Sequence, residues 1–449
     1  MKKENIAHIT SWLLLLIIVL ITTIAEAQTP SVDLKEALRR ARLQNRQLSV
    51  DSLSIETARQ QTIISKGRLL PSIELGGQIN HFFQKPIFFG FGETNNTNSI
   101  GYGRFGGEDQ AQAGVSLLQP LFNPVTFPEI KKSKLLEEQS RQRFKYNETD
   151  LAAQVKQSYL RILVLEKRLN LQRESIARNK KALDDSRSLL VQGRALRVDT
   201  LRAYTSYKNL EPDILRILDA IAISKQQLNI LMGADPSSEL ELKDTLAYNH
   251  ADIILDEIKA YNLSLVQRQD IKILELNQDI SKQQIAAASA AKLPSVNFLS
   301  QYLVQTQTNS FRYGSSKYPP VVYVGAQIAV PLFTGFTNTA KLRQAKIEYK
   351  QSNLIYENAR ELLKTEVKQI ITALNETSKR IQTQQNVSET ASQSYSITKY
   401  RYERGVASRL ELIDAELALT TAQSNYLEAV FNYQSAKIEL DRTLGRDKE

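Results

Sequence analysis

The stretch RYERGVASRLELIDAE, residues 401–416, decides the fold of this chain of 449 residues. It places Gly405 between two helical patterns and follows the glycine with an arginine and two acidic side chains. The segment LLVQGRALRVDTLRAY, residues 189–204, has a similar arrangement, with Gly193 in the place of Gly405. A motif that recurs at this distance indicates a duplicated structural unit.

Three further pairs of segments support the duplication. They are LLPSIEL (69–75) with KLPSVNF (292–298), LQPLFNP (118–124) with AVPLFTG (329–335), and LNILMG (228–233) with LDRTLG (440–445). Their order is the same in both halves of the chain. The sequence therefore predicts two structural repeats, residues 28–235 and 251–449, joined by a linker of residues 236–250.

The N-terminal residues 1–27 have the pattern of a secretory signal peptide. Lys2 and Lys3 precede an apolar run, residues 12–24, and Ala25-Glu26-Ala27 forms a small-residue cleavage site. The apolar run is too short to cross a bilayer, because a spanning helix needs roughly 20 apolar residues. The mature chain is expected to begin at Gln28.

Composition excludes several classes of protein. The absence of cysteine excludes disulfides, thiolate catalysis and a lipid on an N-terminal cysteine. His81 and His250 stand alone, and no nucleophile or metal cluster accompanies them, so we expect neither an enzyme nor a bound metal or cofactor. The net charge is +10, but Lys and Arg alternate with Asp and Glu as on solvated helix faces. A nucleic acid is therefore not an expected partner.

Four segments of about ten residues alternate apolar and polar side chains with the period of a strand. They are residues 72–83 and 110–119 in the first repeat and residues 296–305 and 322–331 in the second. In the first segment Ile73 and Leu75 lie on one face and Glu74 lies on the other. Tilted strands of this length can cross a membrane. The loops between them, 84–109 and 306–320, fit the external loops of an outer-membrane barrel.

Two long segments, residues 128–191 and 338–403, contain no internal Gly or Pro and carry apolar residues at a seven-residue spacing. The spaced residues are Val155, Ile162, Leu169, Ile176, Leu183 and Leu190 in the first segment and Val367, Leu374, Ile381, Tyr395 and Tyr402 in the second. Such a repeat predicts long helices with coiled-coil packing. Shorter helices are expected over 31–67, 195–232, 251–291 and 407–444, with an interruption at Pro212.

The four predicted strands cannot close a barrel by themselves. An open sheet edge in lipid would leave backbone groups unpaired, and the smallest membrane barrels have about eight strands. The chain must therefore pool its strands with copies of itself, two copies giving eight strands and three giving twelve. The long helices would then extend from the membrane, and a hollow bundle of them would form a duct.

With these features the chain resembles the TolC-type outer-membrane efflux proteins, the outer membrane factors of tripartite pumps. The resemblance rests on the duplicated layout, on the LPS and PLF segments, and above all on Y-x-x-G-x-x-S-x-L-E-L-I-D-A, residues 402–415. It implies a mainly α fold with transmembrane β, in which each repeat combines coiled-coil helices with a strand pair. Three chains would form a twelve-stranded β-barrel continued by a twelve-helix periplasmic α-barrel.

The resemblance also implies a location and partners. The protein would lie in the cell outer membrane, in contact with its lipid, with a long periplasmic portion. As a homotrimer it would be the exit duct of a tripartite efflux system, passively conducting substrates from an inner-membrane transporter and a periplasmic adaptor (membrane fusion protein) to the exterior. The exit duct of a one-step (type I) protein secretion system is the alternative, and a periplasmic coiled-coil adaptor is a further one.

Residues at the two glycine motifs receive roles from the resemblance. Glu411 and Asp414 would line the constricted periplasmic mouth, where six carboxylates from three chains would raise one another's pKa values. The helix dipole alone also explains acidic residues in a first helical turn. The hairpin tips that would dock the adaptor comprise Gly193, Arg194, Ala195, Gly405, Val406, Ala407 and Ser408. The residues expected to form salt bridges at the gate are Asp199, Arg197, Arg404 and Arg409.

Overall fold

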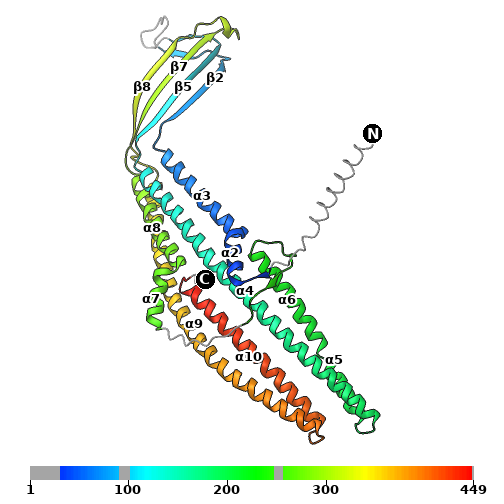
Figure 1. The fold of residues 1–449 in the computed structure, drawn as a ribbon. Coiled ribbons are helices and arrows are strands. Elements are labelled where there is room, and N and C mark those ends of the chain that lie inside the picture. The colour runs from blue at the N-terminus through cyan, green and yellow to red at the C-terminus, as the bar shows by residue number, and fades with distance from the viewer. Residues whose placement is uncertain (1–30, 90–101, 247–255, 447–449) are drawn as a thin grey trace, which may run out of the picture. The chain divides into compact units, whose positions relative to one another are not determined.

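The computed structural model describes residues 31–89, 102–246 and 256–446 (Figure 1). The predicted signal peptide, part of the first external loop and part of the linker lie outside the described residues. The chain divides into two compact units. We call them the helical unit, which comprises the described residues of Met1–Ser52, Arg143–Ile271 and Ala359–Glu449, and the sheet unit, which comprises those of Leu53–Gln142 and Lys272–Asn358.

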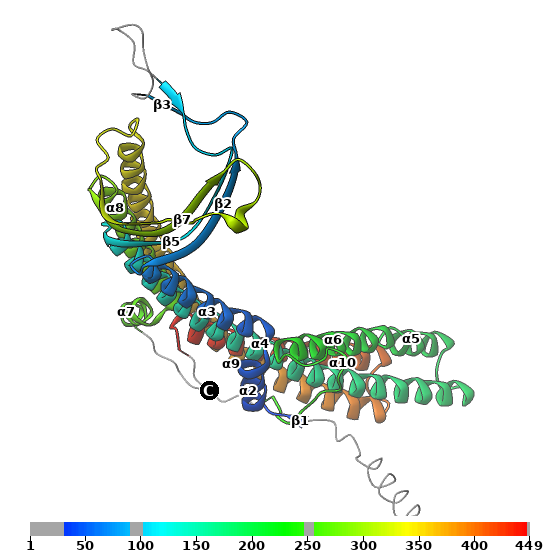
Figure 2. The same ribbon diagram turned by 90° about the horizontal axis from the view of Figure 1, so that it is seen from above.

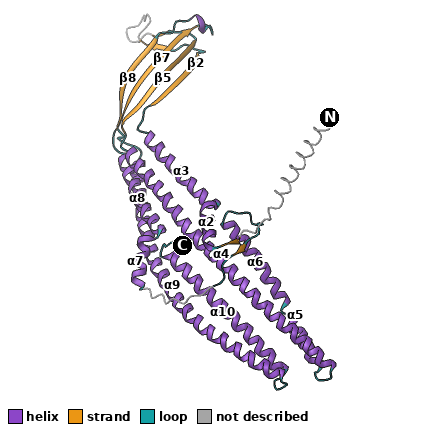
Figure 3. Ribbon diagram, viewed as in Figure 1, coloured by secondary structure: helices purple, strands orange, loops and turns teal. Residues whose placement is uncertain are grey.

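The sheet unit contains one curved antiparallel sheet of four strands (Figure 2). In spatial order these are β2 (Ser72–His81), β5 (Asp109–Phe122), β7 (Ser295–Thr308) and β8 (Pro320–Ala329). The two repeats join at the central pair, β5 and β7, whereas β2 and β8 are the edges (Figure 3). Each edge strand therefore presents one row of backbone groups that this sheet does not pair.

The register sorts the side chains of the sheet into two faces. Leu75 lies opposite Val115, which lies opposite Tyr302, so apolar side chains line up across the strands. On the other face Gln112 lies opposite both Gln78 and Gln305. The Gln112 side-chain amide also donates to Gln78 Oε1 at 3.0 Å. One face is thus rich in apolar residues and the other rich in uncharged polar ones.

The strand ends differ from the predicted ones by a few residues. β2 ends at His81 rather than at 83, and Phe82 N–H donates to the Glu108 carbonyl at 2.6 Å. β8 ends at Ala329 rather than at 331. Pro331 cannot extend the strand pairing, because it has no N–H to donate. β5 continues to Phe122 through an irregularity in its pairing with β7. A short antiparallel strand pair inside the first loop, β3 (Ile87–Phe89) with β4 (Tyr102–Arg104), has no counterpart in the predicted elements.

The two long helices are α4 (Thr126–Val191) and α9 (Thr337–Glu403), and both contribute residues to each unit. In the helical unit α4 forms a hairpin with α5 (Arg197–Lys208) and α6 (Glu211–Leu231), and α9 forms one with α10 (Arg409–Thr443) (Figure 1). The break between α5 and α6 lies just before Pro212, as predicted, because proline fits the first turn of a helix but not its interior. α10 has no such break.

The shorter helices expected over 31–67 and 251–291 are each split, which corrects the prediction of single helices. α2 (Leu34–Gln44) and α3 (Arg46–Gly67) meet at Asn45, and α7 (Glu257–Gln267) and α8 (Gln269–Ala290) meet at Arg268. The Asn45 carboxamide oxygen accepts from the backbone of Gln47 at 2.8 Å, and its nitrogen donates to the Leu231 carbonyl at 2.9 Å. Asn45 thus starts a new helix and anchors the end of α6.

The core of the helical unit lies where α2 packs on α4 and α6. Its fully buried residues include Val32, Ala37, Val155, Ile162 and Leu228. β1 (Ser31–Val32) pairs in parallel with β6 (Glu241–Leu242) at its margin. The buried Tyr159 hydroxyl donates to the Val32 carbonyl of β1 at 3.1 Å and to Asp244, two residues after β6, at 2.7 Å. The linker is therefore fastened to α4 at Asp244.

The seven-residue spacing of the long helices coincides with burial. Val155, Ile162, Leu169 and Leu183 on α4, and Val367, Leu374 and Ile381 on α9, are buried. This stripe gives each helix a packing face, as coiled-coil contacts require. Within the parts of the chain that the structure describes, none of the helices combines the length and the apolar character needed to cross a lipid bilayer.

Candidate functional site

The two hairpin tips are tight turns centred on glycine. Gly193 ends α4 with a φ of 69°, and the N–H of Arg194 donates to the Leu189 carbonyl at 2.9 Å. Gly405 ends α9 with a φ of 75°, and the N–H of Val406 donates to the Arg401 carbonyl at 2.9 Å. Glycine adopts this left-handed conformation at little cost and so allows the chain to reverse at once.

The second tip starts α10 with a reciprocal cap. Ser408 Oγ accepts from the Glu411 N–H at 3.2 Å, and the Glu411 carboxylate accepts from the Ser408 N–H at 3.0 Å. Arg401 Nη1 lies 3.6 Å from the same carboxylate. Glu411 therefore has a local role at the helix start, in addition to the role that the resemblance gives it.

This cap favours the charged form of Glu411 within one chain. The hydrogen bonds from Ser408, with a smaller contribution from Arg401, lower the pKa of the Glu411 carboxyl below its ordinary value. This lowering of the pKa is opposite to the rise expected when six carboxylates lie close together. A single chain contains the hydrogen bonds to Glu411 but not the carboxylates of the other two chains. Glu411 and Asp414 are both exposed, whereas Leu412 between them is buried.

The first tip resembles the second only in part. Asp199 accepts from the Leu196 N–H at 3.3 Å, as a residue in a capping position. Arg202 takes the place that Asp414 has in the second repeat and is exposed. Gly193, Arg194 and Ala195 form the turn itself. The charge at this tip is therefore mixed.

The residues predicted to form gate salt bridges have other neighbours in the single chain. Among the described residues, no ion pair joins Asp199 to Arg197, Arg404 or Arg409. The Arg404 guanidinium lies 5.1 Å from the centre of the Tyr400 ring, and that of Arg409 lies 5.8 Å from Tyr402. The ion pair present at this tip is Arg401 with Glu411.

A buried polar cluster on α4 and α10 lies outside the predicted site. The Glu416 carboxylate accepts from Asn179 Nδ2 at 2.8 Å, from Arg178 Nε at 3.2 Å and from Ser175 Oγ at 3.5 Å. Arg178 also lies over the Tyr395 ring of α9, 5.7 Å from its centre. The cluster thus links the two helix hairpins. Burial raises the pKa of Glu416, although Arg178 opposes the rise.

One signal in the sequence could have found Glu416. Leu412, Glu416 and Leu419 have the spacing of one helix face, and the two leucines are buried. A carboxylate within such an apolar stripe needs a buried partner. That partner is more than two hundred residues away in the sequence and could not be named without the fold.

Comparisons with known proteins agree with this architecture. The family model for outer membrane efflux proteins matches residues 37–234 and 260–446. The protease secretion protein PrtF of Dickeya chrysanthemi is 23% identical over 437 residues, which cover 96% of this chain and 91% of PrtF. The outer membrane protein TolC of Vibrio cholerae is 20% identical over 422 residues, which cover 92% of this chain and 90% of TolC.

Solved structures share the fold. The outer-membrane channel OprN matches with a TM-score of 0.76 at 18% identity, over 92% of this chain and 90% of that one. CusC, which forms a transmembrane channel, matches with a TM-score of 0.74 at 20% identity, over 94% of each chain. These likenesses confirm the expected fold class of a duplicated unit of long helices and a strand pair. Since the family model covers both repeats and well over half of the residues, this chain belongs to the outer membrane efflux protein family.

Proposed function

We propose that this protein is the outer-membrane exit duct of a tripartite efflux system. It passively conducts substrates that an inner-membrane transporter hands over through a periplasmic adaptor. The observation that carries the proposal is the sheet with one apolar and one polar face, whose strands lead into two long helix hairpins. The apolar face suits lipid and the polar face suits an aqueous passage. A periplasmic coiled-coil adaptor does not need a sheet with a lipid-facing side.

The duct is a homotrimer. β2 and β8 are edge strands, and their unpaired backbone groups would be costly in lipid. Pairing the β8 edge of one copy with the β2 edge of the next satisfies both rows, and three copies give twelve strands with room for a passage. Edge residues such as Leu75 and Val324 are 81% and 68% exposed in one chain, and they would face lipid.

The repeats and the signal peptide fit the same proposal. Residues 1–27 direct the chain out of the cytoplasm and are removed, and the two repeats, residues 28–235 and 251–449, each supply one strand pair and one hairpin. Mass spectrometry of the protein from outer membranes should find Gln28 as the first residue. A chain that retains Met1 would contradict the cleavage.

The periplasmic mouth is formed by the second tip. Three copies bring Glu411 and Asp414 together as six carboxylates, a ring that favours cations. The lowered pKa of Glu411 supports a charged ring at neutral pH. Gly193, Gly405 and the tip residues beside them form the surface that docks the adaptor. Asp199 and Arg197, with Arg404 and Arg409, form ion pairs between chains that close the resting mouth.

Single-channel conductance in a planar bilayer tests the proposal. The wild-type protein should give a small cation-selective conductance. The double variant Glu411→Ala, Asp414→Ala should lose selectivity, whereas the matched control Glu357→Ala, Glu361→Ala, which removes two exposed acids of α9 far from the tip in sequence, should keep it. Unchanged selectivity in the first variant would contradict the proposed carboxylate ring. A folded protein that gives no conductance would contradict the proposed function as a duct.

A protein secretion duct is the second candidate. The relative PrtF is a protease secretion protein matched over nearly the whole chain, which is the observation in its favour. Expression in a host that lacks its own duct separates the two functions. Restored growth in toxic compounds would support efflux, and restored export of a secreted protease without that growth would support secretion.

A further inference from the structure

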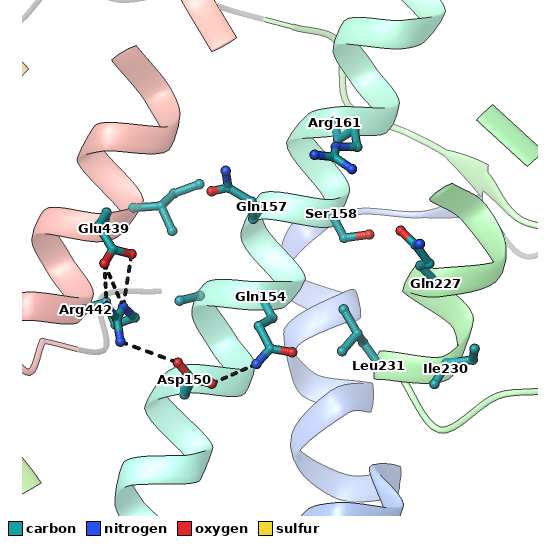
Figure 4. A pocket seen from close by; sticks show the side chains of 12 residues that line it. Asp150, Gln154, Gln157, Ser158, Arg161, Gln227, Ile230, Leu231, Glu439 and Arg442 are labelled. Carbon is teal, nitrogen blue, oxygen red and sulfur yellow. Dashed lines mark hydrogen bonds and ion pairs between the residues drawn. The ribbon is translucent and has the colours of Figure 1, made fainter. Parts of the chain in front are cut away.

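A groove runs along α4 between α6 and α10 in the helical unit. One cavity of about 600 Å³ is lined by residues of all three helices. A second cavity of about 620 Å³ adjoins it, and the two share Arg161 and Gln227 (Figure 4). We call the first cavity the anion groove and define it by Arg161, Val164, Leu165, Arg168, Ile223 and Phe431.

The anion groove lies on the side of α4 that turns away from the core packed on α2, and its Leu165 packs against a smaller buried cluster of Leu169, Ile217 and Ile221. Val155 and Ile162 face the core packed on α2. At about 100° per residue, Arg161 and Arg168 lie more than a quarter turn from that core face. Both arginines are exposed. The rim of the groove is therefore open to solvent, whereas Leu427 and Ser224 at its base are buried.

Two guanidinium groups border the groove without charged partners. Among the described residues, no ion pair involves Arg161 or Arg168. Other cations nearby are paired, since Lys225 lies 3.2 Å from Glu166 and Arg442 lies 3.6 Å from Asp150. One carboxylate, Glu428, also lines the groove. The lining thus has an excess of one positive charge.

Apolar side chains complete the lining between the arginines. Ile223 on α6 is 54% exposed, and Leu165 and Phe431 are partly buried. Polar side chains, among them Gln227 and Asn425, are also part of the lining, and the volume of the cavity is in the range of sites for drug-sized molecules. Guanidinium groups bind carboxylates and sulfonates through paired hydrogen bonds.

We propose that the anion groove binds an amphipathic organic anion of drug size. The acidic group lies between the guanidinium groups of Arg161 and Arg168, and an aromatic or aliphatic body packs on Ile223, Leu165 and Phe431. This binding goes beyond the proposed duct, because passive conduction needs no site on the helices. It requires only the helical unit as folded in the chain.

Fluorescence energy transfer tests the site directly. Trp12, within the predicted signal peptide, is the only tryptophan of the chain, so Phe431→Trp places a reporter in the groove of the protein purified in a nonionic detergent. Titration with 8-anilinonaphthalene-1-sulfonate should give saturable transfer. Adding Arg161→Gln and Arg168→Gln should raise the apparent Kd about tenfold. The control pair Arg173→Gln, Lys180→Gln, which removes equal charge from exposed positions of α4, should leave it unchanged.

Other outcomes would overturn the proposal. If the variant Arg161→Gln, Arg168→Gln and the control variant Arg173→Gln, Lys180→Gln bind with equal affinity, the guanidinium groups of Arg161 and Arg168 do not contribute to the site. N-phenyl-1-naphthylamine has the same rings without the sulfonate, and equal competition by this neutral compound would leave only an apolar surface. Circular dichroism checks that each variant is folded, and Arg161→Lys, which keeps the charge but loses the paired hydrogen bonds, should bind more weakly than wild type and more tightly than Arg161→Gln. Because transfer is measured without a membrane, binding and conduction can fail separately.

Discussion

The Glu416 carboxylate on α10 accepts a hydrogen bond of 2.8 Å from the side-chain amide of Asn179 on α4. The Glu416 side chain is 8% exposed, and that of its ion-pair partner Arg178 is 22% exposed. Because removing one member of a buried pair strands the other, Glu416→Ala should lower the free energy of unfolding by about 2–3 kcal/mol. Glu416→Gln keeps most hydrogen bonds and should lose less than half of that. Thermal unfolding at fixed protein concentration measures both, and equal losses would contradict the pairing.

The pH dependence of stability should show the same carboxylate. Burial raises the pKa of Glu416 above its ordinary value of 4.5. Between that value and the higher folded pKa, the folded chain holds a proton that the unfolded chain releases, so this group's contribution to stability falls as pH rises. Glu416→Gln cannot titrate. The difference in Tm between variant and wild type should therefore shift in favour of the variant as pH rises from about 4.5, and a constant difference would contradict the raised pKa.

Two glycines with similar backbones should respond differently to alanine. Gly233 and Gly193 have φ values of 75° and 69°. A Cβ at Gly233 would lie 2.1 Å from the Gln44 carbonyl oxygen, whereas nothing lies within 4 Å at Gly193. Gly193→Ala should cost about 1–2 kcal/mol for the left-handed conformation alone. Gly233→Ala adds a backbone clash and should cost about 3 kcal/mol or more. Similar losses in chemical denaturation would show that the end of α6 can move away from α2.

The pattern of the sequence predicts regular packing well and single distant contacts poorly. The spacing of Val155 and Ile162 marks a buried stripe without knowledge of what covers it. The break at Asn45 depends on the carbonyl of Leu231, and the burial of Glu416 depends on Arg178. Neither contact has a local pattern, because each joins segments from different parts of the chain. The sequence around Glu411 is compatible with a role in a helix cap and with a role in a pore lining. The structure of one chain contains the cap.

Loss of the cap should change both the stability and the charge of the second tip. Ser408→Ala removes the hydroxyl that caps α10 and should cost about 1 kcal/mol. Loss of the hydroxyl should also raise the pKa of Glu411 part of the way toward its ordinary value, because the hydrogen bond from the Ser408 backbone N–H, the largest cause of the lowering, remains. The cation selectivity of the channel would then disappear at a higher pH than in wild type, because lowered pKa values keep a carboxylate charged in more acid solution. Ser408→Thr keeps the hydroxyl and is the control. If Ser408→Ala and wild type show the same dependence of cation selectivity on pH, the cap does not control the pKa of Glu411.

Lysine substitutions on the two faces of β2 should show which face of the sheet contacts lipid and which lines the aqueous passage. Leu75 lies on the apolar face and Gln78 on the polar face of the same strand. On a membrane barrel, a lysine that replaces a lipid-facing residue near the bilayer centre costs about 2–4 kcal/mol, whereas one facing the lumen is tolerated. Leu75→Lys should therefore reduce the folded trimer recovered from outer membranes. Gln78→Lys should assemble normally and shift the conductance toward anions. Equal assembly of the two variants would mean that the apolar face of the sheet does not meet lipid.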